Sequence, residues 1–341
     1  MHKAVRLADI ADELGISIVT VSKALSGQKG VSEDLRKKIL DVADERGYRN
    51  QPVGGRKNGS LAEEYNFVVF MHEKYMDSRD SFYIKLYQEI TAKALSLGLL
   101  VTLQIITEAM EKTLDVSELE YISSYDGIIF MGKFRNEYYE KIVEMFEIPM
   151  INLDFYDEKV DIDSVISDNF YGAYRLTKYL FDKGHTKIAY VGMIEATDSI
   201  IDRFMGYSKA LLCHGRNVKT DWVVADRYGA MGSRRLREFR LPKEMPTAFF
   251  CNNDMTAGYL INQLEANGFR VPEDISVVGY DNFLYSGMCD VEITTYEVNL
   301  KEMACASVDL LFKKFKDSDY KSGLIIIPGR LVEKNSVKEV G

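Results

Sequence analysis

Apolar positions near the start of the chain recur at helical spacing. Four of them fall at i, i+3, i+4 and i+7, which predicts a short helix with one apolar face: Leu7, Ile10, Ala11 and Leu14. Gly15 follows at once, as a glycine does just past the end of a helix. The pattern therefore predicts a first helix that stops at residue 14.

Two further short helices follow. The first begins after Ser17, a good N-cap residue, and turns Val21, Ala24 and Leu25 inward. The second is capped by Ser32, has an acidic first turn, carries an apolar stripe and closes at Gly47; the stripe is Leu35, Ile39, Val42 and Ala43. Two short helices joined across residues 15–17 predict a helix-turn-helix within a three-helix head.

From residue 66 the pattern changes to short apolar, β-branched runs that alternate with amphipathic helices. The predicted strands are 66–71, 99–106, 126–132, 149–155, 187–192, 247–253 and 275–282. Strand–helix alternation predicts parallel sheets with helices on both faces, and about 275 residues exceed what one such sheet holds. We therefore expect an α/β body of two doubly wound lobes, with a ligand between the carboxyl ends of their strands.

A glycine-rich stretch, "QPVGGRKNG", separates the two patterns at residues 51–59. Proline and glycine without an apolar period are typical of a linker. The expected organisation is a helix-turn-helix head at 1–50, a hinge at 51–64 and a two-lobed domain at 65–341.

The charge divides along the same line. The whole chain carries −9, but residues 1–60 hold 11 Lys and Arg against 8 Asp and Glu, which leaves +3 on that segment and −12 on the rest. This asymmetry is typical of a nucleic-acid-binding head on an acidic body, although +3 also falls within the scatter of a short segment.

Several classes of protein are disfavoured. The chain has no apolar run of membrane-spanning length, its N-terminus has no signal-peptide core, and its four cysteines show no paired or metal-like spacing. No phosphate-binding loop, dinucleotide fingerprint, nucleophile elbow or zinc-protease motif occurs. We expect a cytoplasmic protein that is not an enzyme, without cofactor or metal.

The second helix is the predicted DNA reader. Thr20 and Ser22 offer hydroxyls to phosphates, and Lys23 reaches a guanine edge or a phosphate. Ile18 and Val19 are apolar residues without a core to enter, and thymine methyls would contact them in a major groove. The alternative is an ordinary three-helix bundle that binds protein.

Polar residues end three of the predicted strands. The pairs are Asp168-Asn169, Asn253-Asp254 and Asp281-Asn282, whose short donors and acceptors suit a polyhydroxylated ligand. Such residues also serve as helix caps and turn formers, so each pair on its own has an ordinary structural explanation.

The segment "VRLADIADELGISIVTVSKALSGQKGVSEDLRKKILDVADERGY" resembles the DNA-binding head of the lactose-repressor (LacI/GalR) family. The resemblance implies that Ile18, Val19 and Lys23 read bases, and Ser32 completes the expected set of DNA contacts on the head. Most relatives have Arg where this chain has Lys23. A single ammonium replaces a bidentate fork there, so the resemblance does not carry over which base is preferred at this position.

The body resembles the same family's effector domain, which is similar to periplasmic binding proteins of type I. The motifs are "DNFYGAYRLTKYLFDKGHTKIAYVG", "DRFMGYSKAL", "NNDMTAGYLINQLEANGFRVPEDISVVGYDN" and "ITTYEVN". The resemblance implies that Arg203 clamps an effector and that Asn253 and Asp281 hydrogen-bond it. Further expected contacts are Asp168, the opposite-lobe residues Phe82 and Tyr83, and Tyr228, for which Trp222 is the rival.

The resemblance implies an effector-gated transcriptional regulator. A homodimer, with a tetramer as the alternative assembly, would read a pseudo-palindromic operator. A sugar or sugar derivative is the favoured effector and a purine or nucleoside the second. An uncoupled solute-binding sensor and an enzyme are the remaining alternatives.

The hinge departs from the family pattern. Relatives form a short helix there that wedges a leucine into the minor groove, whereas this chain has Gly54, Gly55 and Lys57 at the positions concerned. Each glycine costs about 1 kcal/mol of helix stability, and an ammonium is no apolar wedge. We expect a flexible tether, or at most a weakly formed helix, whose Arg56 and Lys57 contact phosphates or the minor groove.

Overall fold

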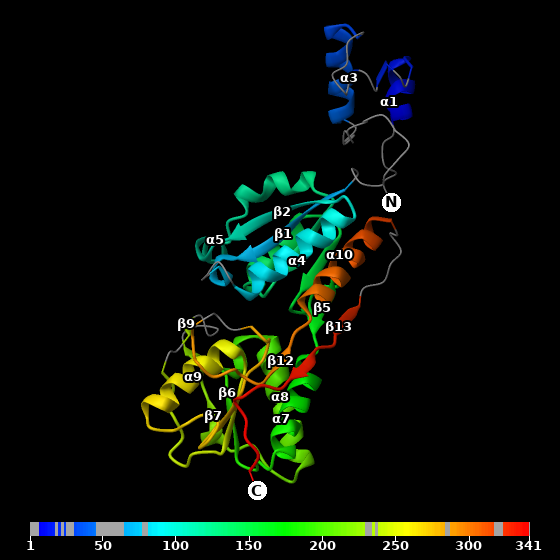
Figure 1. Cartoon of the computed structure of the whole chain (residues 1–341). Coiled ribbons are helices and arrows are strands. Elements are labelled where there is room, and N and C mark those ends of the chain that lie inside the picture. Colours follow the sequence, from blue (N-terminus) through cyan, green and yellow to red (C-terminus); the bar gives the residue numbers. More distant parts are fainter. Residues whose placement is uncertain are drawn as a thin grey trace. The chain divides into compact units, whose positions relative to one another are not determined.

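The structure, a computed structural model, describes residues 7–17, 20–21, 24, 31–45, 65–76, 81–228, 234–235, 238–283, 287–316 and 323–340. The chain forms two compact units, Met1–Ser60 and Leu61–Gly341. Figure 1 shows the helical first unit in blue and the α/β second unit in the remaining colours.

The first unit contains α1 (Leu7–Leu14) and α3 (Glu33–Glu45), and residues 20, 21 and 24 are helical between them. Gly15 ends α1 in the left-handed region at φ 63°, as its position predicted. Ser17 Oγ accepts a hydrogen bond from the Thr20 backbone N–H at 3.1 Å, which is the predicted N-cap. The buried core follows the predicted stripes: Ile10, Ala11, Val21, Ala24, Ile39 and Ala43.

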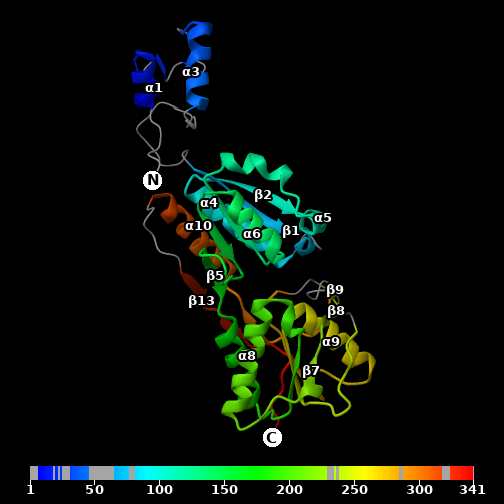
Figure 2. The same ribbon diagram turned by 180° about the vertical axis from the view of Figure 1, so that it is seen from behind.

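The second unit has two lobes. The first lobe holds a six-stranded sheet in the order β13-β5-β4-β3-β1-β2, in which every pairing is parallel. Its strands are β1 (Asn66–His72), β2 (Leu100–Ile106), β3 (Gly127–Met131), β4 (Met150–Leu153), β5 (Asp163–Ser167) and β13 (Leu324–Ile327). Its helices are α4 (Phe82–Ser96), α5 (Glu108–Thr113), α6 (Asn136–Met145) and α10 (Leu300–Lys316). Figure 2 shows α6 from behind.

The second lobe holds a four-stranded parallel sheet in the order β11-β10-β6-β7. Its strands are β6 (Ile188–Val191), β7 (Val223–Val224), β10 (Ala248–Cys251) and β11 (Ser276–Val278), and a small hairpin pairs β8 (Arg227–Tyr228) with β9 (Arg234–Arg235). Its helices are α7 (Asn169–Asp182), α8 (Asp198–Cys213) and α9 (Asp254–Ala266). Among the described residues of the two lobes, 3-10 turns occur at Glu73–Tyr75, Ser117–Ser124, Ile194–Ala196 and Thr220–Trp222.

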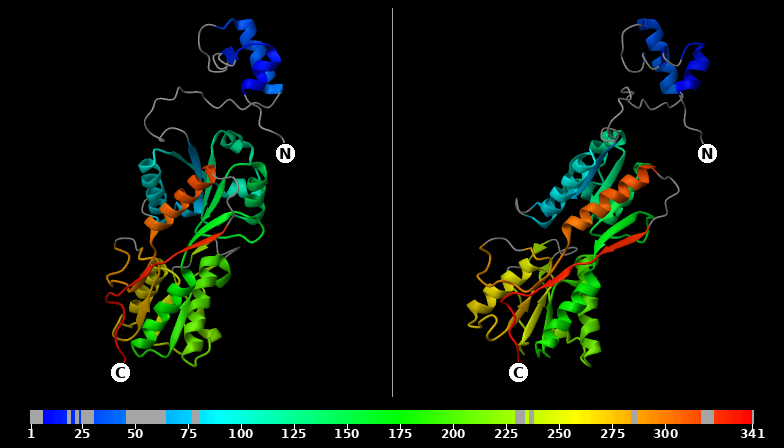
Figure 3. Two further views of the ribbon diagram at one scale, coloured as in Figure 1. Left: turned by 90° about the vertical axis from the view of Figure 1, so that its right-hand side faces the viewer. Right: turned by 45° about the vertical axis from the view of Figure 1, so that its right-hand side comes forward.

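The chain passes between the lobes three times: after β5, before α10, and between β13 and β14 (Arg330–Val332). β14 pairs antiparallel with β12 (Thr295–Glu297) beside these crossings. Figure 3 shows the red segment with β13 and β14 running from one lobe to the other. Gly172 on α7 leaves room there for the Tyr280 and Tyr296 rings, because a Cβ at this position would collide with both.

The carboxyl ends of the strands determine where the candidate site lies. Because each sheet is parallel, the segments that follow β3, β4, β6, β10 and β11 leave the sheets at their carboxyl edges, where the two lobes face each other. Of the helices that the structure describes, none is long and apolar enough to cross a bilayer.

Candidate effector site and DNA-binding head

Arg203 is the central charged residue where the lobes meet. It lies on α8 and is only 6% exposed. Its Nε donates to Asn169 Oδ1 at 2.8 Å, and its Nη1 donates to the Asn252 carbonyl at 2.6 Å. Its Nη2 lies 3.0 Å from Asp281 Oδ1. Three separate segments of the second lobe therefore fix the orientation of one guanidinium.

The surroundings keep that guanidinium charged. Burial disfavours the charge, but Asp281, Tyr280 and Asp154 outweigh it, so the pKa of Arg203 lies above its ordinary value. The guanidinium carbon lies 3.9 Å from the centroid of the Tyr280 ring, a cation–π contact. Tyr280 is in turn fixed by its hydroxyl, which donates to the Asp168 carbonyl at 2.9 Å.

The first lobe contributes a hydrogen-bonded pair to the same region. The Tyr83 hydroxyl donates to Asp154 Oδ2 at 2.7 Å, and the Tyr83 ring packs on Tyr75 with 4.0 Å between centroids. Asp154 follows β4 directly and has φ 67°, a left-handed conformation that non-glycine residues rarely adopt. Burial raises the pKa of Asp154 to about 6, although Tyr83 and the charge of Arg203 act in the opposite direction.

Further contacts join the lobes around this pair. Lys133, which follows β3, lies 2.9 Å from Asp198 at the start of α8. The hydroxyl of Tyr156, in the segment after β4, hydrogen-bonds Asp202 on α8. We call the following charged and tyrosine side chains of the two lobes the interlobe cluster: Tyr83, Lys133, Asp154, Tyr156, Asp198, Asp202, Arg203 and Asp281.

Two expected effector residues cap helices in the second lobe. Asp168 accepts a hydrogen bond from the Tyr171 N–H at 3.1 Å and begins α7. Asn253 accepts one from the Thr256 N–H at 2.8 Å and begins α9. One side-chain oxygen of Asp168 and one of Asn253 therefore act as ordinary helix caps. The Asn253 amide retains its donor group.

The expected aromatic contacts are distributed differently. Phe82 is half-buried and meets Phe283 of the other lobe edge-on, with 6.2 Å between ring centroids. Tyr228 is 50% exposed in β8. Its rival Trp222 is buried in the core of the second lobe and donates its indole N–H to the Glu244 carbonyl at 2.9 Å. The ring of Tyr228 is therefore more accessible to a ligand than that of Trp222.

Sequence reasoning named Asn169 within the pair Asp168-Asn169 but did not name it as a partner of Arg203, and it did not single out Asn252, Asp154, Lys133 or Asp198. Asn252 directly precedes the predicted Asn253, so the strand-end signal located that turn but selected the adjacent residue. Asp154 fell inside the predicted strand 149–155, whereas β4 ends at Leu153, so the predicted boundary hid the strand-end position of this residue. No sequence signal pairs Lys133 with Asp198, which are 65 residues apart.

Two buried polar atoms near Arg203 have no hydrogen-bond partner among the described residues: Asn252 Oδ1 and Asp254 Oδ1. Asp254 is 2% exposed, and its other oxygen accepts from the Phe283 N–H at 2.8 Å. Burial and the charge of Asp281 raise the pKa of Asp254 to about 8. A protonated carboxyl fits this environment, because an uncharged group costs less to bury.

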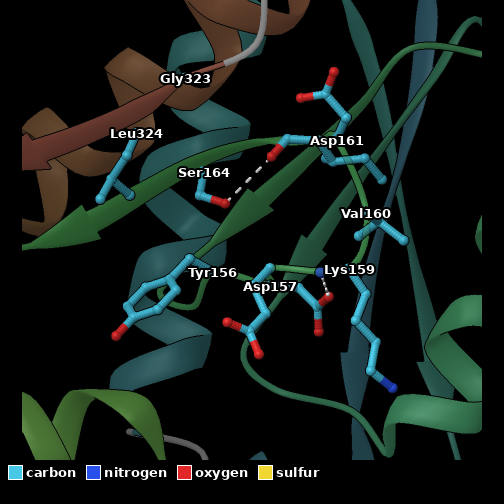
Figure 4. A pocket seen from close by; sticks show the side chains of 10 residues that line it. Tyr156, Asp157, Lys159, Val160, Asp161, Ser164, Gly323 and Leu324 are labelled. Carbon is cyan, nitrogen blue, oxygen red and sulfur yellow. Dashed lines mark hydrogen bonds between the residues drawn. The ribbon is translucent and has the colours of Figure 1, made fainter.

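A surface pocket of about 430 Å³ lies on the first lobe, between the segment after β4 and the start of β13, and it shares Tyr156 with the interlobe cluster. Figure 4 shows Tyr156, Asp157, Lys159 and Asp161 around it, with Leu324 at its edge. None of the seven expected effector residues lines it. Three of those expected residues, Tyr83, Arg203 and Asp281, belong instead to the interlobe cluster, which is therefore the better candidate. No group of metal ligands occurs among the residues that the structure describes.

In the head, the structure describes two of the expected DNA contacts. Thr20 is partly exposed, and its hydroxyl hydrogen-bonds Ser17 Oγ at 2.9 Å. Ser32 is exposed directly before α3. Ile18, Val19, Ser22 and Lys23 lie outside the described residues. So do Arg56 and Lys57, and with them the expected behaviour of the hinge at 51–59.

Two family models match the chain. The model "Bacterial regulatory proteins, lacI family" matches residues 6–51, and the model "Periplasmic binding protein-like domain" matches residues 177–337. The first covers most of the head, and the second covers the second lobe from within α7 onward together with α10 and β13 of the first lobe.

Individual proteins match over nearly the whole chain. The HTH-type transcriptional repressor PurR of Vibrio campbellii is 25% identical over 336 residues, which is 98% of this chain and 99% of the relative. Among solved structures, a transcriptional regulator CelR–cellobiose complex aligns with a TM-score of 0.68 at 18% identity, over 97% of this chain and 99% of that one. The lac repressor dimer bound to operator and the anti-inducer ONPF aligns with a TM-score of 0.64 at 23% identity, over 98% and 100%.

Proposed function

The chain is a LacI-family transcriptional regulator with a periplasmic-binding-protein-like effector domain, and we propose that it represses a carbohydrate-related operon and that a small effector changes its affinity for operator DNA. Proteins of this family bind operator DNA and a small effector, typically as dimers, and are not enzymes.

The observation that carries the proposal is the orientation of Arg203. Three hydrogen-bonding partners and a stacked Tyr280 hold its guanidinium where both lobes contribute polar side chains. A buried, charged and rigid group is costly in a merely structural role, because replacing such ion pairs with apolar residues is often neutral or stabilising. A ligand that hydrogen-bonds Arg203, Asp281, Asn253 and Asp154 would join the two lobes.

A sugar fits the donors and acceptors of this set. Carboxylates, an amide and an arginine fork can each hydrogen-bond vicinal hydroxyls, and Phe82, Tyr228 and Phe283 supply apolar ring surface for a sugar face. The CelR complex with cellobiose is a fold relative with a sugar bound, which favours the same class here. Thermal-shift screening of sugars is the experiment that would identify which sugar binds.

A purine or nucleoside is the second candidate. Phe82 and Phe283 bring one aromatic ring from each lobe to the site, with 6.2 Å between centroids. A flat base can stack on such rings, while its edge hydrogen-bonds Asn253 and Asp281. The PurR relatives match over the full chain, although their identity of about 25% fixes the family rather than the ligand.

Assembly and division of labour are part of the proposal. Residues 1–50 bind DNA, 51–64 connect, and 65–341 bind the effector and dimerise, so that two heads read the two halves of a pseudo-palindrome. Effector binding changes the lobe geometry only through a difference in affinity between two states. We place the protein in the cytoplasm, with its operator.

A gel-shift experiment tests the function. The full-length protein is titrated against the region upstream of its own operon, with and without sugars and nucleosides preselected by thermal shift. The proposal expects a specific complex, competed poorly by unrelated DNA, whose apparent Kd changes at least tenfold with one effector. A protein that binds no DNA specifically, or whose binding no ligand alters, contradicts it.

A further inference from the structure

The interlobe cluster contains more acid than base. Its two cations are each paired with a carboxylate: Lys133 with Asp198 at 2.9 Å, and Arg203 with Asp281 at 3.0 Å. Asp154 and Asp202 remain. Their hydrogen-bond donors are the hydroxyls of Tyr83 and Tyr156, which carry no charge.

The surroundings of Asp154 and Asp202 disfavour the ionised form of these two carboxyl groups. Asp154 and Asp202 are both only partly exposed. Burial raises the pKa of each, and the neighbouring Asp198 raises the pKa of Asp202 further. Raised values mean that the surroundings disfavour the negative charge even before a ligand arrives. A ligand that brings another negative charge makes this worse, whereas hydroxyl donors or an ammonium relieve it.

Nearby cations do not reverse this balance. Lys74 and Lys85 are exposed at the margin, where Lys74 Nζ donates to the Lys133 carbonyl and Lys85 lies 5.9 Å from the Phe283 ring centroid. Arg227 is held by Asp226 at 3.0 Å. Water screens exposed ammonium groups strongly, so their contribution at the cluster is small.

Arg203 is also poorly placed to serve as an anion receptor. Its Nε, Nη1 and Nη2 each already have an acceptor, and the last of these is a carboxylate. An incoming phosphate or carboxylate would compete with Asp281 for the same fork and would leave Asp281 without its counter-ion. An uncharged ligand can use the remaining N–H groups without disturbing that pair.

Resting on the effector-binding function proposed above, we propose that this site selects its effector by charge. It accepts uncharged polyhydroxylated ligands and amine-bearing ones, and it rejects phosphorylated and carboxylated relatives of the same compounds. Asp154 and Asp202 are the residues that set this selectivity. Both lie at the junction of the lobes, on opposite sides, so the discrimination acts on the joined form.

The test uses ligands matched in shape. Glucose, galactose and mannose are each supplied as the parent sugar, the 2-amino sugar, the uronamide, the uronate and the 6-phosphate, and adenosine is paired with its 5′-monophosphate. The uronamide and the uronate differ in charge with almost no change in size. Affinities of the full-length dimer are measured by calorimetry, with operator DNA absent.

For every series that binds, we expect the uncharged or amine form to bind at least tenfold more tightly than the anionic one. In the variant Asp154→Asn/Asp202→Asn the gap between uronamide and uronate should shrink to below threefold. The control Asp182→Asn/Asp221→Asn removes two exposed carboxylates outside the cluster and should keep the wild-type gap.

Three results would overturn the inference. An anionic compound that binds wild type as tightly as its uncharged match shows that charge does not select. A gap that persists unchanged in the Asp154→Asn/Asp202→Asn variant shows that these residues do not set it. Both leave the effector-binding function standing. If no compound of any series binds, the proposed function fails for sugars and nucleosides, and this inference fails with it.

Discussion

Arg203 and Asp281 lie 3.0 Å apart, and Asp281 holds a backbone φ of 96° while making that contact. Left-handed backbone at an aspartate costs energy that the surrounding structure must supply. The side chain of Arg203 is 8% exposed and that of Asp281 17% exposed, so water does little to screen the pair. The pair therefore connects the turn after β11 rigidly to α8.

The first prediction concerns this pair. Arg203→Ala and Asp281→Ala should each abolish the effector response and keep operator binding without effector, if the effector is an inducer. Losing a charge-assisted hydrogen bond in such a site costs about 1.5–3 kcal/mol, or roughly tenfold to a hundredfold in effector affinity. Each single variant should also melt at a lower temperature, because it leaves its partner buried without a counter-charge.

Calorimetry with the screened effector measures this loss, and gel shift measures the retained DNA binding. The conservative variant Asp281→Asn keeps an acceptor for Arg203 and should lose less affinity than Asp281→Ala. Unchanged effector affinity in both alanine variants would remove Arg203 and Asp281 from the site.

The second prediction concerns the reader helix. Lys23→Ala and Thr20→Ala should abolish operator binding in a protein that remains folded and dimeric, because each lost base or phosphate contact costs on the order of 1–3 kcal/mol. Thr20→Ser retains the hydroxyl and should bind nearly as well as wild type. Lys178→Ala, which removes an exposed lysine from α7, is the charge-matched control. Wild-type binding by both alanine variants would show that another surface reads the operator.

The third prediction uses the buried carboxyl of Asp254. Its folded-state pKa of about 8 exceeds its ordinary value of 3.8, so the folded state binds more protons than the unfolded state between these values. The contribution of Asp254 to stability is therefore present below about pH 4 and falls as pH rises towards 8. Asp254→Asn removes this dependence, while its amide oxygen can still accept from the Phe283 N–H.

Urea denaturation at pH 5, 7 and 8.5 checks the sign. The free energy of unfolding of wild type relative to Asp254→Asn should decrease steadily from the lowest pH to the highest. For Asp221→Asn, which alters an exposed carboxylate, the plot of the free energy of unfolding against pH should run parallel to that of wild type. Parallel profiles for Asp254→Asn as well would mean that Asp254 is ionised throughout.

The fourth prediction concerns the ion pair between Lys133 and Asp198. Their side chains are 23% and 20% exposed, so the pair contributes at most about 1 kcal/mol to stability. Because it joins the two lobes, Lys133→Met should shift the population towards separated lobes with little change in melting temperature. Small-angle scattering of the protein would record a larger radius of gyration without effector. The charge-swapped variant Lys133→Asp/Asp198→Lys should restore the wild-type radius; an identical radius in Lys133→Met would show that the pair does not hold the lobes.

The fifth prediction concerns the hinge at 51–59. With glycines at 54 and 55 and Lys57 in place of an apolar wedge, operator affinity should depend steeply on salt and bending should be shallow. Arg56→Ala and Lys57→Ala should each reduce the slope of log Kd against log salt by about 1. Lys57→Leu should instead increase bending, measured by fluorescence transfer between labelled operator ends. An ordered helix over 51–57 with a kinked central step in the operator complex would contradict the tether.

The fold was largely predictable because its strands are apolar and its helices periodic. All seven predicted runs contain a strand: β1, β2, β3, β4, β6, β10 and β11. β5 was missed because its polar Asp163, Ser164 and Ser167 are buried. Their partners are distant in sequence: Lys314 and the Gly323 N–H bind Asp163, and Asn152 donates to Ser164. No local pattern reveals such compensation.

The candidate site was predictable in position more than in detail. Arg203 and Asp281 came from a resemblance, and the structure brings them into contact. Which oxygen caps a helix and which one orients Arg203 depends on a single residue step at each strand end. Asn169 and Asn252 hold Arg203, while Asp168 and Asn253 cap the helices. That choice is made by tertiary packing, which the spacing of polar residues does not encode.

The three passages of the chain between the lobes have a consequence for biosynthesis. β13 and α10 belong to the first sheet and its helical cover, and α10 packs along α4, which lies more than 200 residues earlier. A ribosome must therefore release nearly the whole polypeptide before the first lobe can be completed. Until then β5 lacks its neighbour β13, and the apolar side of α4 lacks its cover by α10. The nascent chain therefore exposes an unpaired strand edge and apolar surface that a chaperone can recognise. The second lobe can assemble most of its sheet first, although its strands are translated later.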